Sequence, residues 1–158
     1  MCRATEFLLQ IRRVDRIIEN KIAEKEQWKA LSLNTVAAPP ADTGVRVQSS
    51  GDHQRMASAI ERYIVIDEEI NKWVDELVKI KRDVTSVIEQ LDTVEYDVLH
   101  KMYVGQVNVD DPRVRVKYWT LNEIAELYDR SYNWAKAKRG QARKNVQKIL
   151  DSRKTGEH

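Results

Sequence analysis

Four side chains near the C-terminal end have types and a spacing suited to contacting base pairs of double-stranded DNA. Tyr132, Asn133, Lys136 and Arg139 lie within eight residues, so a helix would gather them on its first two turns. An asparagine amide can bond N6 and N7 of adenine, and an arginine guanidinium can grip O6 and N7 of guanine. We therefore predict that these four residues contact base edges in the major groove.

Further cations in the same region are candidates for contact with backbone phosphates. Arg143 and Lys144 follow the four residues above, while Arg115 and Lys117 alternate with apolar residues in the stretch 105–118. Phosphate contacts of this kind position a protein on DNA, whereas base contacts specify the sequence. The alternation after residue 112 is strand-like, and two interpretations stay open: a short extended wing or an irregular charged loop.

The elements that would position these residues are two helices joined by a tight turn. Thr120 and Glu123 fit a capping box at the start of the first helix, and Ser131 is a candidate N-cap for the second, which we expect over residues 131–150. From Ser131 to Lys154 the chain has eight Lys or Arg and one acid, Asp151. A basic second helix entered by a short turn is typical of a helix-turn-helix on DNA. The alternative is a solvated basic helix that closes a bundle.

Residues 91–150 resemble region four, the C-terminal DNA-binding domain of bacterial sigma factors. The segment 98–103, VLHKMY, matches the "vL..rY" pattern before its helix-turn-helix, and the run TLNEIAEL from Thr120 matches the common "T..EIA..L" first helix. Ser131 matches the serine that opens the recognition helix. Two departures are Asp129, where sigma domains usually have Gly in the turn, and the long segment 105–118.

The order of parts along nearly all 158 residues is more similar to a family of small phage and prophage proteins of Gram-positive bacteria. These put an N-terminal helical hairpin before a sigma-like domain and are related to the RinA/ArpU-type regulators of phage genes. The local matches are the junction from Ser49 to Met56 and the segment 139–142. The resemblance implies a DNA-binding transcription regulator of phage or prophage genes, in the cytoplasm of the bacterial host, with RNA polymerase as a second partner.

The N-terminal part is predicted to form a long antiparallel helical hairpin, a coiled coil of residues 4–34 and 53–91 joined by a Pro- and Gly-containing linker at 35–52. The seam of the second helix recurs every seven residues: Met56, Tyr63, Ile70, Leu77, Val84 and Leu91. The fold class is therefore all-α, with a hairpin at 1–92 and a helix-turn-helix domain at 93–158, where Thr93 is expected to cap a helix over 94–104.

Two further columns of residues flank this seam. Ile60, Val74 and Ile88 occupy the complementary heptad positions, and Asp67 and Lys81 interrupt that column, where we expect them to fix the register at some cost in stability. A second apolar column widens the stripe: Ile66, Trp73, Ile80 and Val87. Three apolar positions per heptad exceed the need of a two-stranded seam. The hairpin is therefore expected to have a second partner, either another protomer in a dimer or the C-terminal domain.

Composition argues against most catalytic classes. The net charge is +2, but residues 93–158 carry 13 Lys or Arg against 9 Asp or Glu, while residues 1–92 carry 14 against 16. Cys2 is the sole cysteine and the three histidines are far apart, so we expect no disulfide, metal or cofactor. No enzyme motif, signal-like segment or membrane-spanning run is present, which favours an intracellular, non-catalytic protein. A helical scaffold that binds RNA polymerase or another phage protein without reading DNA is the alternative function.

Overall fold

The computed structural model describes residues 2–36, 50–107, 109–110 and 115–156. Within these ranges the chain is mostly helical, and one pair of two-residue strands is present. The contacts divide the chain into two compact units, Met1–Arg13 with Leu77–His158 and Val14–Glu76. Residues 92 and 93, on either side of the expected domain boundary, both belong to the first of these units.

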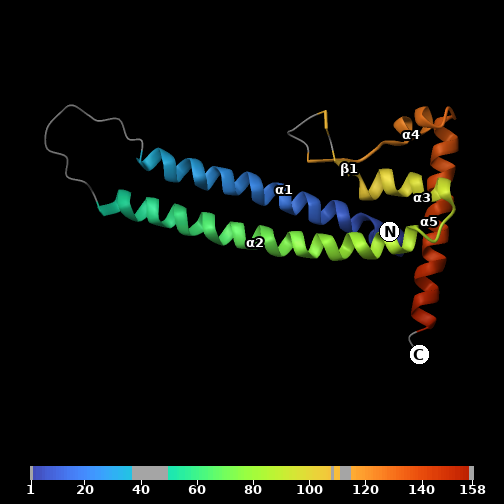
Figure 1. The fold of residues 1–158 in the computed structure, drawn as a ribbon, viewed down its shortest axis with the longest axis horizontal. Helices are drawn as coiled ribbons and strands as arrows, with labels where there is room; N and C mark the ends of the chain where they lie inside the picture. Colours follow the sequence, from blue (N-terminus) through green and yellow to red (C-terminus); the bar gives the residue numbers. More distant parts are fainter. Residues whose placement is uncertain (1, 37–49, 108, 111–114, 157–158) are drawn as a thin grey trace. The chain divides into compact units, whose positions relative to one another are not determined.

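The two long helices form the antiparallel hairpin that the heptad pattern predicts (Figure 1). They are α1 (Arg3–Val36) and α2 (Ser50–Ile88). The residues that connect them lie outside the described part of the chain. Leu91, the last member of the expected seam, is not on α2: its backbone N–H bonds the carbonyl of Ile88 at 3.0 Å in the turn after the helix.

Ion pairs fix the register within the unit Val14–Glu76. Lys21 bonds Glu69 at 2.7 Å, and Lys25 bonds Asp67 at 2.5 Å. Arg62 lies 3.2 Å from Glu24. Asp67, which interrupts an apolar column of α2, therefore pairs with a lysine of α1 across the hairpin, which agrees with the register role expected for it.

Burial along α2 departs from the expected stripe on one side. Ile70, Leu77 and Val84 of the seam are buried, and Met56 and Tyr63 are half-buried. Ile66 and Val87 of the widening column are fully buried, whereas Ile60 is 43% exposed. In this part of the helix the buried face therefore lies between the seam and the widening column, which corrects the core position expected for Ile60.

The C-terminal region begins with α3 (Thr93–Leu99), followed by a turn of π-helix, η1 (His100–Val104). The predicted single helix over 94–104 thus changes type at its middle. Its N-cap is Asp92 and not Thr93, because the Asp92 carboxylate accepts the backbone N–H of Glu95 at 2.8 Å. This carboxylate satisfies a donor of the first turn that otherwise has no partner in the helix.

A short antiparallel ribbon follows, made of β1 (Gln106–Val107) and β2 (Val116–Lys117), with Gln106 opposite Lys117. Gly105 enters it at φ +80°, and a Cβ there would lie 2.6 Å from Val116 Cγ1, so only glycine fits. The ribbon agrees with the extended-wing interpretation at residues 116–117, whereas most of the stretch between the strands lies outside the described residues.

The last two helices are α4 (Leu121–Leu127) and α5 (Tyr132–Thr155), and α5 packs against both α3 and α4 (Figure 1). The side of α5 that faces the core is a stripe of small and aliphatic residues: Ala135, Ala142, Val146 and Leu150. Glu95 of α3 is 2% exposed, and its carboxylate accepts two hydrogen bonds from the Asn145 amide at 3.1 and 2.9 Å. This bond satisfies a buried charge on the α3–α5 interface.

Candidate nucleic-acid interface

The caps at the starts of α4 and α5 are those that the sequence predicts. Thr120 and Glu123 form the capping box, with the Thr120 hydroxyl accepting from the Glu123 backbone N–H at 3.3 Å. The Ser131 hydroxyl caps α5 by accepting the backbone N–H of Trp134 at 3.1 Å. Between the helices Asp129 has φ +52°, the left-handed conformation that a turn of this kind requires.

A partly buried hydrogen bond connects this turn to α3. The Tyr128 hydroxyl donates to the Asp97 carboxylate, which also accepts from Lys101. Burial and the bond to Asp97 raise the pKa of Tyr128 to about 12. Burial opposes ionisation of Asp97, but the bonds from Lys101 and Tyr128 outweigh it, so the pKa of Asp97 lies below its usual value. Trp134 is half-buried against the Tyr128 ring, 5.3 Å between centroids, as expected of a packing role.

The outer face of α5 presents polar and basic groups. Asn133, Lys136 and Lys144 are exposed, and Tyr132 is 48% exposed. In the part of the chain that the structure describes, neither lysine forms an ion pair, and no acidic residue occurs from Tyr132 to Leu150. The structure therefore brings three of the four predicted base-contact residues and one predicted phosphate-contact residue to the exposed side of a single helix.

Gly140 lies on this helix without any steric need for glycine in the chain itself. A Cβ built on Gly140 meets nothing within 4 Å. A glycine inside a helix lets a neighbouring helix or a DNA backbone approach closely, and no described helix approaches Gly140. A glycine inside a helix costs about 1 kcal/mol relative to alanine, so its presence is unfavourable for folding.

The other predicted phosphate-contact residues have intramolecular partners. Arg143 donates from Nε to the hydroxyl of Tyr103 at 2.9 Å. Lys117 forms an ion pair with Glu123 at 2.6 Å and lies 5.0 Å from the centroid of the Trp119 ring. Arg115 is exposed, and Arg113 lies outside the described residues. Arg143 and Lys117 therefore form bonds within the C-terminal region, which stabilise its fold.

Arg139 lies apart from the exposed face. It lines a pocket of about 390 Å³ together with Tyr132 at the start of α5 and Arg12 of α1. Sequence reasoning missed Arg12, because the cluster of Arg12, Arg13 and Arg16 suggested pairing with acids of a neighbouring helix. Neither the residue type of Arg12 nor its position in the helix indicates that Met102, ninety residues later in the chain, lies beside it.

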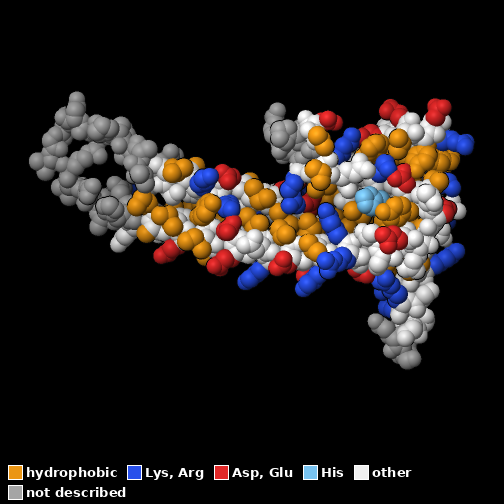
Figure 2. All heavy atoms as spheres, in the orientation of Figure 1, with side chains coloured by type: hydrophobic (Ala, Val, Ile, Leu, Met, Phe, Trp, Pro, Cys, Tyr) orange, Lys and Arg blue, Asp and Glu red, His pale blue; other side chains and the backbone are white. Residues whose placement is uncertain are grey.

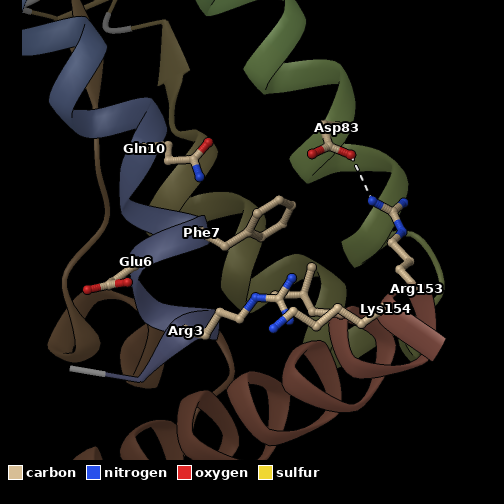
Figure 3. A pocket seen from close by; sticks show the side chains of 8 residues that line it. Arg3, Glu6, Phe7, Gln10, Asp83, Arg153 and Lys154 are labelled. Atoms are coloured by element: carbon tan, nitrogen blue, oxygen red, sulfur yellow. Dashed lines mark hydrogen bonds and ion pairs between the residues drawn. The ribbon is translucent and has the colours of Figure 1, made fainter. Parts of the chain in front are cut away.

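A second pocket, of about 360 Å³, lies among α1, α2 and α5 (Figure 3). Its cations have carboxylates nearby: Arg153 bonds Asp83 at 2.8 Å, and Arg3 lies 3.8 Å from Asp151. Glu6 also lines it. These cations are balanced within the protein, and the pocket has no excess of positive groups comparable with that of α5.

Comparison of the chain with protein-family models, curated proteins and solved structures gave no match. Among the residues described, no group of three or more His, Cys, Asp or Glu side chains is placed to hold a metal ion. None of the described helices has both the length and the hydrophobicity needed to cross a bilayer.

The bond between Tyr128 and Asp97 gives a prediction about stability. Tyr128→Phe should lower the free energy of unfolding at neutral pH by about 1.5–3 kcal/mol, because a hydrogen bond to a charged acceptor is lost. The depressed pKa of Asp97 contributes stability that is complete above its unfolded value and is lost as the pH falls through its folded value. The acid-induced loss of stability should therefore be smaller in Tyr128→Phe than in the wild type.

The measurement is urea unfolding at pH 7 and across pH 2–5. Tyr132→Phe is the matched control, because the Tyr132 hydroxyl is at an exposed position and has no hydrogen bond within the described residues. Equal stabilities of the two variants at pH 7 would contradict a stabilising role for the Tyr128 bond.

Proposed function

We propose that the chain is a DNA-binding transcription regulator of phage or prophage genes, in which α4 and α5 act as a helix-turn-helix and α5 enters the major groove. The caps at Thr120 and Ser131 and the left-handed Asp129 support this proposal, because they produce a short first helix, a tight turn and a longer second helix. The similarity of residues 91–150 to sigma region four favours the same use of α5.

The observation that carries the proposal is the exposed face of α5. It presents an amide, a phenol and lysines over the first four turns, and no carboxylate interrupts it before Asp151. Because DNA has one negative charge per about 1.7 Å of its axis, a face of this kind is attracted to it at any sequence. The amide of Asn133 and the phenol of Tyr132, on the first turn, would supply base contacts, and Lys136 and Lys144 would hold flanking groups.

The first test is competition binding of the purified chain to fragments from its own genomic neighbourhood, which identifies a specific site. Asn133→Ala should then weaken binding to that site by about 1–3 kcal/mol and leave binding to random DNA nearly unchanged, because a base contact is lost. Lys144→Gln should weaken both and reduce the slope of log affinity against log salt by about one.

Lys29→Gln is the control for charge, since Lys29 is an exposed lysine of α1 outside the proposed interface. Specific binding that survives Asn133→Ala would reject the residue assignment, and an absence of specific binding by the wild type would reject the function.

Gly140 gives a prediction in which stability and function change in opposite directions. Gly140→Ala should raise the free energy of unfolding by up to about 1 kcal/mol, because a helix-interior glycine is removed and the new Cβ meets no neighbour. The same change should weaken DNA binding, because the methyl group separates α5 from the DNA backbone. Thermal unfolding and DNA titration of the same preparation measure both effects, and Ala137→Ser on the exposed face is the control. Unchanged affinity would mean that no DNA backbone approaches Gly140.

A second candidate function, protein binding by the hairpin, is favoured by apolar side chains on its surface. On α2, four aliphatic side chains are 43–51% exposed: Ile60, Ile64, Val65 and Val78. Figure 2 shows such hydrophobic side chains on the hairpin between charged ones. Ile60 and Ile64 lie one helical turn apart, and contiguous exposed apolar groups mark protein interfaces. The partner would be a second copy of the chain, as the wide stripe suggested, or host RNA polymerase.

Light scattering after size exclusion tests the self-association. If the hairpin forms a dimer through this surface, Ile64→Glu should convert dimer to monomer, because a charge would be buried in the interface. Ser58→Glu, at an exposed polar position of the same helix, should not. A monomeric wild type at micromolar concentration would reject the dimer, and co-purification with RNA polymerase would then test the other partner.

A further inference from the structure

The pocket that contains Arg12 and Arg139, the arginine pocket, is distinct from the exposed face of α5. Six of its lining side chains have polar or aromatic character: Arg12, Tyr118, Trp119, Asn122, Tyr132 and Arg139. They come from α1, from the segment between β2 and α4, from the start of α4 and from the first half of α5. Tyr132 belongs both to this pocket and to the exposed start of α5, so the pocket borders the proposed DNA-binding face.

The described residues that line the arginine pocket include two guanidinium groups and no carboxylate. Arg139 is half-buried, its Nε is inaccessible to solvent, and no hydrogen bond or ion pair joins this side chain to any described residue. A buried donor without an acceptor is unfavourable, and an anion beside the same guanidinium would offset that cost.

Arg12, which also lines the pocket, is held in place by two aromatic rings and a backbone carbonyl. Its guanidinium carbon lies 5.2 Å from the Tyr103 ring centroid and 4.7 Å from the Tyr118 ring centroid, and one terminal nitrogen donates to the carbonyl of Met102. A guanidinium between two rings loses little further freedom when it binds an anion. The planar donors of arginine match the oxygens of a phosphate group in particular.

We propose that the arginine pocket binds a phosphate group carried by a nucleotide, with Arg12 and Arg139 as its ligands. The rings of Tyr118, Trp119 and Tyr132 offer surfaces against which a sugar or base can pack, and the Asn122 amide offers a polar contact. The phosphate has two sources, a DNA backbone beside the α5 groove or a free mononucleotide. The DNA source rests on the proposed function, whereas the mononucleotide source does not.

The neighbouring pocket shows why the arginine pocket is singled out. Its three basic residues, Arg3, Arg153 and Lys154, share their surroundings with Glu6 and Asp83, and Arg153 is bonded to Asp83 (Figure 3). Both pockets are similar in volume, and both have arginines from α1 and α5. Among the described lining residues, carboxylates occur in this second pocket and not in the arginine pocket.

The test compares Arg12→Gln and Arg139→Gln with Arg13→Gln in the full chain. Arg13 is an exposed neighbour on α1 that does not line the pocket. One arm titrates DNA at several salt concentrations. The other titrates adenosine 5′-monophosphate and inorganic phosphate while following the fluorescence of Trp119, with Trp119→Phe to identify its signal. Arg139→Gln removes no bond to any residue that the structure describes, so it should fold even if Arg12→Gln does not, and circular dichroism checks both.

A DNA salt slope lowered by about one in the Arg12→Gln and Arg139→Gln variants, but not in Arg13→Gln, would support the DNA source. Nucleotide binding that weakens at least tenfold in Arg139→Gln, with an unchanged salt slope, would support the mononucleotide source. An unaltered slope together with no nucleotide or phosphate binding would overturn the proposal, even if the wild type binds DNA. If the wild type binds no DNA, the proposed function fails, and the nucleotide arm alone decides whether the pocket proposal stands.

Discussion

Tyr103 is the residue on which the C-terminal unit depends, because its ring connects three segments that are distant in sequence. It is 2% exposed at the π-helical turn η1, with the guanidinium carbon of Arg12 5.2 Å from its centroid and that of Arg143 at 5.6 Å. Its hydroxyl accepts from Arg143 Nε. Each such cation–π contact is worth about 2 kcal/mol when it is desolvated. The π-helical turn changes the winding of the helix after Leu99 and so determines the direction of the Tyr103 side chain. That direction sets where Arg12 of α1 and Arg143 of α5 contact the ring.

The parts of the fold that the sequence predicts are those whose physics is local. A cap is decided by a side chain and a backbone N–H three residues apart, so Thr120 and Ser131 could be assigned without knowing the rest of the chain. The heptad repeat likewise predicts a long helix and its apolar stripe. It does not determine which edge of the stripe is buried, because that depends on the partner helix, and Ile60 proved exposed while Ile66 proved buried. At the start of α3 both Asp92 and Thr93 have capping side chains, and the repeat gives no reason to prefer either.

The sequence could predict the helix that forms the candidate site, but not which of its basic side chains have partners within the protein. A basic side chain has the same type and spacing whether its partner is a phosphate or a group in the same protein. Arg143 meets a buried phenol and Lys117 meets the carboxylate of a capping box, both through contacts that only the fold creates. The same holds for Arg12, whose bond to the Met102 carbonyl spans ninety residues. Helical periodicity could place Lys136 and Lys144 on an outer face, but it could not show that Arg139 turns away from Asn133 into a pocket.

The positive charge of the outer face of α5 depends on which nearby acids pair with its basic residues, and not on the net charge of the chain. Along the hairpin, acids and bases alternate and pair, as Lys21 with Glu69 and Lys25 with Asp67. From Tyr132 to Leu150 there is no acid with which a lysine of the outer face could pair on its own helix. At physiological ionic strength, screening confines a charge to about 8 Å, so distant carboxylates do not cancel that face. A chain with a net charge of +2 can therefore present a strongly positive helix face.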